Sequence, residues 1–319
     1  MKMKIPKFGL NRHDTSSVLN YAKDVSRSEK YGWDAAFLPD SQLRRRDTYV
    51  LLGSAALSTE KIVLGPLLVN PVTRHPSVTA SSIATIAEMA PGRTILGCGI
   101  GDTAVRLVGL KPATVRQLES SVRLIRSLLL GDPVEVGADR PARLPFPQDV
   151  PVWVAAGTYL SKAGTGNFGV GERADDVEGF RLAAAPVDRV ARIGDGWLTN
   201  HCTADEYKPA LDRVRQLATE KYGRDPDALE TIYCAGLYVD PDVDAAYKEV
   251  KWYEDSYHAM SVPEDTIRRW TIFGDPDACI KQMQPFADAG IKVFNICVRA
   301  RDMFSQVRAI AKDVLPAFS

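Results

Sequence analysis

The chain has 319 residues, of which 45% are hydrophobic and 25% charged, which is the ordinary balance of a globular protein. Lysine plus arginine and aspartate plus glutamate both number 40, so net charge gives no reason to expect nucleic acid or an anionic membrane as a partner. No apolar run approaches the roughly 18 residues of a membrane span. Five scattered cysteines without metal-ligand spacing predict reduced thiols, no metal site and a cytoplasmic protein.

Short apolar runs and amphipathic segments alternate along the chain. Strands are predicted at residues 8–10, 35–38, 62–69, 94–98, 150–156, 197–199, 232–239 and 293–298. Helices are predicted at about 15–31, 49–57, 76–88, 115–130, 207–221, 243–257, 276–289 and 303–314. This alternation predicts an α/β fold with a parallel sheet, and eight units in this length predict a (β/α)8 TIM barrel. A doubly wound sheet with a second domain would also alternate, but no linker marks a boundary, so a single domain over 1–319 is expected.

One region departs from this rhythm. Residues 158–186 are rich in glycine, alanine and charge and show no clear period. A loop of this length in a compact domain is usually a lid or a binding loop, so an insertion after the fifth strand is predicted. Residues 164–169 match G-x-G-x-x-G, but no strand precedes them directly and no helical pattern follows, so a dinucleotide site is not predicted there.

Acidic residues follow two of the predicted strands. Asp40 comes after the second predicted strand. Asp102 directly follows the glycine-rich stretch 97–101 at the end of the fourth predicted strand. In a barrel the carboxyl ends of the strands converge on one mouth, where two carboxylates could position a ligand or move a proton. Each of them could equally be a loop or cap residue.

The same glycine-rich stretch permits another interpretation. A strand, then Gly-Cys-Gly-Ile-Gly at 97–101, then a helix resembles the first motif of S-adenosylmethionine methyltransferases, where glycines let the backbone approach the ligand. The acidic residue usual before the first glycine is absent, since Ile95 and Leu96 stand there. Three strand–helix units also precede the motif, so this interpretation remains a remote alternative.

Residues 64–102 carry a resemblance to a known family. The stretch LGPLLVNPVTRHPSVTASSIATIAEMAPGRTILGCGIGD is similar to the luciferase-like monooxygenase superfamily of flavin- and coenzyme F420-dependent oxidoreductases. Its N-P-x-T-R-H-P, A-P-G-R and G-x-G-x-G-D elements look most like the methylenetetrahydromethanopterin reductase branch. Further matches follow in order at residues 189–197, 273–277 and 289–296, so the resemblance covers nearly the whole chain.

The resemblance implies a (β/α)8 barrel whose mouth holds a reduced flavin or deazaflavin. It implies a cis peptide bond between Leu67 and Leu68 that bulges against the isoalloxazine ring, with Asn70 near the ring system. It also implies that the loop containing Gly99 and Gly101, with Asp102 behind it, faces the catalytic region.

The resemblance further places the cofactor phosphate near Ala156, Gly157 and Thr158 and near Gly194, because backbone N–H groups suit a phosphate. Two departures leave the cofactor open. Many F420 enzymes have Asp-His after the second strand, where this chain has Asp40 and Ser41. The insertion 158–186 also replaces a helix that is normally short.

The function implied by the resemblance is hydride transfer between coenzyme F420 and a small organic substrate, with Asp40 and Asp102 as candidate catalytic residues. The main alternative is an FMN-dependent monooxygenase of the same superfamily. Besides the methyltransferase, a non-catalytic flavin-binding barrel is a further remote alternative. By analogy with the family, a homodimer is expected.

Overall fold

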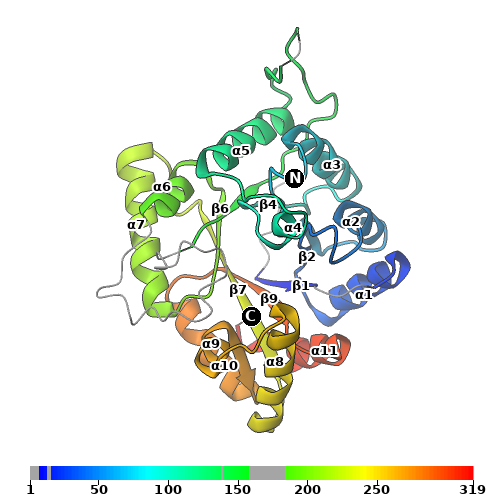
Figure 1. Ribbon diagram of the computed structural model, residues 1–319, viewed down its shortest axis with the longest axis vertical. Helices are drawn as coiled ribbons and strands as arrows, with labels where there is room; N and C mark the ends of the chain where they lie inside the picture. The colour runs from blue at the N-terminus through cyan, green and yellow to red at the C-terminus, as the bar shows by residue number, and fades with distance from the viewer. Residues whose placement is uncertain (1–6, 13–15, 138, 158–183, 319) are drawn as a thin grey trace. The chain divides into compact units, whose positions relative to one another are not determined.

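The computed structural model describes residues 7–12, 16–137, 139–157 and 184–318 (Figure 1). Its internal contacts divide the chain into two compact units. Unit 1 consists of residues 1–155 with 193–197, and unit 2 consists of residues 156–192 with 198–319. Strand β6 (Gly196–Asn200) begins in unit 1 and ends in unit 2.

Unit 1 is a succession of parallel strands joined by helices. Its strands β1 to β5 are Phe8–Asn11, Ala35–Leu38, Val63–Pro66, Leu96–Cys98 and Val152–Ala155. β1 pairs with β2, β2 with β3 and β4 with β5, all in parallel. β3 and β4 are joined by the parallel bridges Leu64↔Thr94 and Val69↔Cys98. All residues of β1 to β4 are buried, as expected for a parallel sheet covered on both faces.

The helices of unit 1 begin and end where the sequence provides caps. Helices α1 to α5 are Val18–Tyr31, Thr48–Ala56, Pro76–Met89, Thr103–Arg106 and Val115–Leu130. Thr114 and Gln117 form a capping box at the start of α5, and Gly131 ends that helix in the left-handed conformation. α1 packs on α2, α2 on α3 and α3 on α5, and Figure 1 shows these helices in succession along the strands.

Unit 2 contains β7 (Glu230–Val239), which pairs in parallel with both β8 (Thr271–Gly274) and β9 (Val293–Val298). Its helices α6 to α11 are Ala184–Ile193, Ala204–Tyr222, Val243–His258, Glu264–Trp270, Pro276–Asp288 and Met303–Asp313, and a 3-10 helix follows at Leu315–Phe318. Val250, Ile267 and Trp270 belong to a buried cluster between α8, α9 and β8. Over the residues described above, no helix is both long and apolar enough to cross a membrane.

Most predicted elements are confirmed to within a few residues, but β8, α6 and α9 are not among them. β8 has only four residues between two helices, which is too short for a period to be visible. The last predicted strand, 293–298, is therefore β9. The end of the predicted insertion, residues 184–186, forms the first turn of α6 instead of a loop. Residues 158–183 lie outside the described residues, and the single domain stays a prediction.

Glu29 of α1 caps the amino end of β3. Its carboxylate accepts hydrogen bonds from the backbone N–H groups of Glu60, Lys61 and Ile62, the last two at 2.8 and 2.7 Å. Burial raises the pKa of Glu29, but these hydrogen bonds and the charge of Arg93 bring it below its ordinary value. The stabilisation is therefore present above the unfolded-state pKa and is lost as the pH falls through the folded-state pKa.

We predict that Glu29→Gln lowers the free energy of unfolding at pH 7 by about 1–2 kcal/mol, because neutral hydrogen bonds replace charge-assisted ones. The difference from the unsubstituted protein should shrink as the pH falls below the ordinary glutamate pKa of 4.5. Urea unfolding across this pH range measures both effects, with Glu88→Gln on the exposed surface of α3 as the control. A loss that does not depend on pH would contradict the assignment.

Candidate active site

The chain leaving β3 stays hydrogen-bonded to its neighbour β2 after the strand ends. The N–H of Leu67 donates to the carbonyl of Leu38 at 2.7 Å, and the N–H of Asp40 donates to the carbonyl of Leu68 at 3.1 Å. The Leu67–Leu68 peptide bond is cis, as the family resemblance predicted. Leu67 is buried and Leu68 is partly exposed. Asp40 is thus attached through its backbone to the segment that the resemblance places against the cofactor ring.

The same segment is bonded on its other side to the chain leaving β4. The N–H of Gly99 donates to the carbonyl of Val69 at 3.0 Å. A Cβ on Gly99 would lie 2.8 Å from Leu68 Cδ1, and a Cβ on Gly101 would lie 3.0 Å from Asn70 Cβ. These glycines therefore allow the two chain segments to touch. We call residues 67–70 with 99–101 the strand-exit wall.

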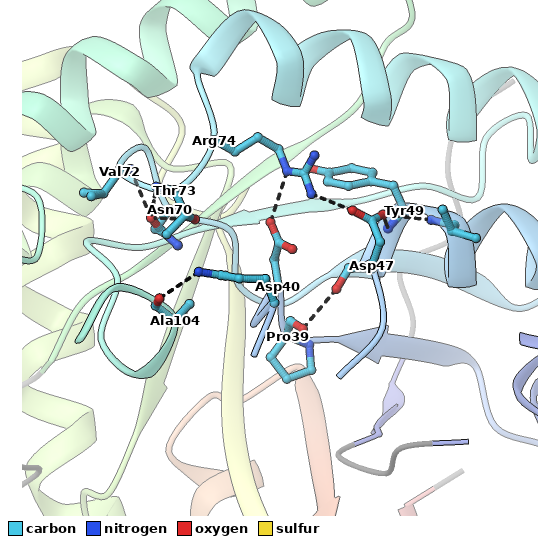
Figure 2. Close-up of polar contacts among 12 residues, drawn as sticks. Pro39, Asp40, Asp47, Tyr49, Asn70, Val72, Thr73, Arg74 and Ala104 are labelled. Carbon is cyan, nitrogen blue, oxygen red and sulfur yellow. Dashed lines mark hydrogen bonds and ion pairs between the residues drawn. The ribbon is translucent and has the colours of Figure 1, made fainter. Parts of the chain in front are cut away.

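Asn70 organises the turn that follows β3. Its Oδ1 accepts hydrogen bonds from the N–H of Val72 at 3.0 Å, the N–H of Thr73 at 2.9 Å and the hydroxyl of Thr73 at 3.2 Å (Figure 2). A side-chain oxygen that accepts from residues two and three positions ahead forms an Asx turn. This turn sets the course of the chain to Arg74.

Figure 2 shows the Arg74 guanidinium between two carboxylates and against an aromatic ring. Its Nε lies 3.4 Å from Asp40 Oδ2, and its Nη2 lies 2.9 Å from Asp47 Oδ2. The guanidinium carbon is 4.8 Å from the centroid of the Tyr49 ring, within cation–π range. One arginine therefore joins the exit of β3, the exit of β2 and the start of α2.

The two carboxylates bound to Arg74 have opposite pKa shifts. Burial raises the pKa of Asp40 above its ordinary value, and the charge of Arg74 offsets only part of that increase. Burial also raises the pKa of Asp47, but the hydrogen bonds from Val50 N–H and from Arg74 outweigh it and bring the pKa below its ordinary value. Of the two, Asp40 is the carboxyl group suited to exchange a proton.

Two buried polar atoms near the strand ends have no hydrogen-bond partner among the described residues: Asn11 Oδ1, at the end of β1, and Ser41 Oγ, after β2. Asn11 is 4% exposed and Ser41 is 6% exposed. Buried polar atoms are normally paired, so these two at the exits of the neighbouring strands β1 and β2 fit a ligand that carries polar groups. Leu68 in the strand-exit wall is partly exposed and offers apolar surface to a ring. The residues present therefore suit a flavin-type ring.

Asp102 lies in the same group of loops, but its carboxylate already has a partner. Arg106 Nε lies 2.6 Å from Asp102 Oδ1 within the first turn of α4, and the Asp102 side chain is 28% exposed. Gln42 Nε2 donates to the carbonyl of Ala104 at 3.0 Å, which ties α4 to the exit of β2. A role of Asp102 in the reaction would require it to act beside Arg106.

The predicted phosphate residues after β5 are only partly described. The N–H of Ala156 donates to the carbonyl of Leu198 at 3.0 Å, so it already has an acceptor. Gly157 is exposed. Thr158 lies outside the described residues.

Gly194 is not brought together with the strand-exit wall. It lies just before β6, and the N–H of the next residue, Asp195, donates to the carbonyl of Val152 at the first residue of β5. This is the amino end of the parallel strands, whereas Gly99 follows their carboxyl end. The G-D-G motif that contains Gly194 therefore precedes a strand instead of following one, and the place of Gly194 beside the cofactor stays a prediction.

Five side chains of the site were not predicted: Asn11, Ser41, Asp47, Tyr49 and Arg74. Arg74 stands in the N-P-V-T-R-H-P stretch that carried the resemblance, directly after a strand whose neighbour ends at Asp40. Because the carboxyl ends of neighbouring strands lie together, the positions of Arg74 and Asp40 in the sequence could have indicated that their side chains are close. His75, the next residue, caps α3 by accepting from the N–H of Ser77 at 3.3 Å, which is a structural role.

Comparison with known proteins identifies the family. The luciferase-like monooxygenase family matches residues 3–171 and 183–292. The chain belongs to this family. As a luciferase-like protein it is 24% identical to the 5,10-methylenetetrahydromethanopterin reductase of Archaeoglobus fulgidus, over 97% of this chain and 99% of that protein. The predicted superfamily and branch are thereby confirmed.

Two solved structures establish the fold class of this luciferase-like protein. One is the coenzyme F420-dependent tetrahydromethanopterin reductase from Methanopyrus kandleri, with a TM-score of 0.74 at 19% identity over 98% of this chain and 99% of that one. The other is the oxygenating constituent of 3,6-diketocamphane monooxygenase from Pseudomonas putida in complex with FMN, with a TM-score of 0.69 at 16% identity over 98% and 99%. The predicted (β/α)8 TIM barrel is confirmed, and the protein is an enzyme of the luciferase-like oxidoreductase class.

The contact between the two halves of the strand-exit wall can be tested with two glycines. Gly101 and Gly109 both have positive φ, at 85° and 72°, but only at Gly101 would a Cβ meet other atoms, 3.0 Å from Asn70 Cβ in the other half of the wall and 2.5 Å from Val105 Cγ2 of α4. We predict that Gly109→Ala lowers the free energy of unfolding by about 1–2 kcal/mol through backbone strain alone. Gly101→Ala should cost about 1–3 kcal/mol more because of overpacking. Equal losses in urea unfolding would contradict the close contact.

Proposed function

We propose that this protein is an oxidoreductase that transfers a hydride between coenzyme F420 and a small organic substrate. One observation carries the proposal: the exits of β2, β3 and β4 are hydrogen-bonded to one another, so that Asp40 lies beside the strand-exit wall. A flat redox ring against this wall would have a carboxyl group with a raised pKa close by.

The choice of coenzyme F420 over FMN is supported by the named relatives. The Archaeoglobus fulgidus protein is a methylenetetrahydromethanopterin reductase, and the Methanopyrus kandleri enzyme is described as dependent on coenzyme F420. When bound, this coenzyme exchanges hydride at the carbon that replaces flavin N5 and does not usefully activate oxygen, which separates it from FMN. The FMN-bound neighbour keeps an FMN-dependent monooxygenase as the second candidate.

Different residues of the chain would bind the cofactor and transfer the proton. Leu67, Leu68 and Asn70, together with Gly99 and Gly101, would hold the ring, and the backbone after β5 at Ala156, Gly157 and Thr158 would lie near the phosphate. The Asp40 carboxyl group would take or return the proton that the substrate loses or gains. Among the residues that the structure describes, the buried Asn11 Oδ1 and Ser41 Oγ have no hydrogen-bond partner. Asn11 Oδ1 would accept a hydrogen bond from the ligand, and the Ser41 hydroxyl group would accept or donate one.

The remaining expectations from the sequence also belong to this proposal. The substrate is a small molecule, tetrahydromethanopterin being one possibility among several, and neither nucleic acid nor a membrane is a partner. The protein is a homodimer located in the cytoplasm. Size-exclusion chromatography with light scattering measures the first of these two properties directly.

The cofactor is tested by adding F420 and FMN separately to the purified protein. We predict that the fluorescence of F420 changes on binding at micromolar concentration and that FMN binds at least tenfold more weakly. Binding of FMN alone, with oxygen consumption on reduction, would establish the monooxygenase instead. Binding of neither cofactor would overturn the proposal.

The two candidate carboxylates are tested by Asp40→Asn and Asp102→Asn. We predict that Asp40→Asn lowers kcat by about 10²–10⁴, the usual contribution of a positioned acid or base. Asp102→Asn should lower kcat by a smaller factor, because Arg106 already neutralises this carboxylate. Circular dichroism checks that both variants fold. Full activity in Asp40→Asn would remove Asp40 from the reaction.

A further inference from the structure

Asp47 uses its two carboxylate oxygens for two different purposes. Oδ1 accepts the N–H of Tyr49 at 2.9 Å and the N–H of Val50 at 3.1 Å, which caps the amino end of α2. Oδ2 accepts from Arg74 Nη2 at 2.9 Å. The cap needs only one oxygen, so the second interaction is an independent feature of the site.

Arg74 is held more tightly by Asp47 than by Asp40. Its contact with Asp47 is 2.9 Å long, whereas its contact with Asp40 is 3.4 Å, and the face of the guanidinium lies on Tyr49. A guanidinium that faced Asp40 alone could form two parallel hydrogen bonds with it. Asp47 and Tyr49 therefore keep Arg74 turned so that only one nitrogen reaches Asp40.

We propose that Arg74 and Asp47 are positioning residues for Asp40. Arg74 orients the Asp40 carboxyl group beside the strand-exit wall. Asp47 binds Nη2 of Arg74, so that Arg74 pairs only partly with Asp40 and Asp40 can still bind a proton. This rests on the proposed role of Asp40 in proton transfer. It assigns a function to two residues outside the strand-exit wall.

The charges that face Asp40 act in the direction the proposal requires. Burial is the largest influence and raises the pKa of Asp40, Arg74 lowers it, and the negative charge of Asp47 raises it again. Tyr49, which packs against Arg74, is buried with its own pKa raised, and burial also raises the pKa of the neighbouring Cys98 thiol, so both groups stay neutral. Removing Asp47 therefore removes a repelling charge and frees Arg74 to pair fully with Asp40, and both changes favour the ionised carboxylate.

The test is Asp47→Asn, because asparagine is as good a helix cap as aspartate and retains the Oδ1 acceptor but cannot accept from Arg74 through its NH₂ group. Asp242→Asn is the matched control: Asp242 caps α8 through the N–H groups of Asp244 and Ala245. Carboxyl carbon NMR on the full chain follows the titration of Asp40, whose signal is identified by its absence in Asp40→Asn. This measurement needs neither cofactor nor substrate.

We expect the Asp40 titration midpoint to fall by about one pH unit in Asp47→Asn, to rise by about one to two units in Arg74→Gln, and to stay unchanged in Asp242→Asn. An unchanged midpoint in Asp47→Asn, with the helix content retained, would overturn the inference and leave Asp47 as a cap alone. An unchanged Asp40 midpoint in Arg74→Gln would also overturn the inference, because it would show that Arg74 only joins the exits of β2 and β3 to the start of α2.

The pH dependence of kcat/KM separates this inference from the proposed function. If Asp40 transfers the proton, the limb of the profile that it controls should move to lower pH in Asp47→Asn by the same amount as the NMR midpoint. A midpoint that moves while the profile stays in place would support the positioning of Asp40 and contradict its role in proton transfer.

Discussion

The site depends on main-chain hydrogen bonds that continue past the ends of three parallel strands. Strands normally separate where they end, because loops of different length and shape leave each one. Here the segment after β3 is bonded to the exit of β2 on one side and to the exit of β4 on the other. The contact with β4 is possible because Gly99 and Gly101 lack side chains where a Cβ would meet Leu68 or Asn70. Backbone geometry, more than any one side chain, builds the wall.

The charged side chains near this backbone scaffold form ion pairs with one another. Arg74 is bound by two carboxylates, and Arg106 is bound by Asp102. Burial then distinguishes the two partners of Arg74: the more buried Asp40 holds its proton more strongly, and the cap residue Asp47 holds its proton less strongly. The Arg74 guanidinium thus binds Asp47, which caps a helix, and Asp40, which is the candidate for proton transfer. The two aspartates differ in pKa because their environments differ.

Much of the fold could be predicted from the sequence, because buried parallel strands are continuous apolar runs and the helices carry clear caps such as Thr114. β8 was missed because four residues show no period, and residues 184–186 were placed in a loop because α6 begins inside a stretch of low complexity. Asp40 could be found from its position after a strand and Asn70 from the family resemblance, although their roles stay predictions. Gly194 lies just before β6, a position that its motif alone could not indicate, because glycine-rich turns occur at both ends of strands. The pairing of Arg74 with Asp47 depends on side-chain packing over the Tyr49 ring, which no pattern in the sequence reveals.

The central claim is that the strand-exit wall receives the flat ring of a redox cofactor. The most direct measurement is a crystal structure of the protein soaked with coenzyme F420. The account predicts the ring against the Leu67–Leu68 backbone, with Asn70 at its edge and the carboxyl group of Asp40 within reach of the face that meets the substrate. A ring bound elsewhere, with the wall covered by side chains of the protein itself, would contradict it.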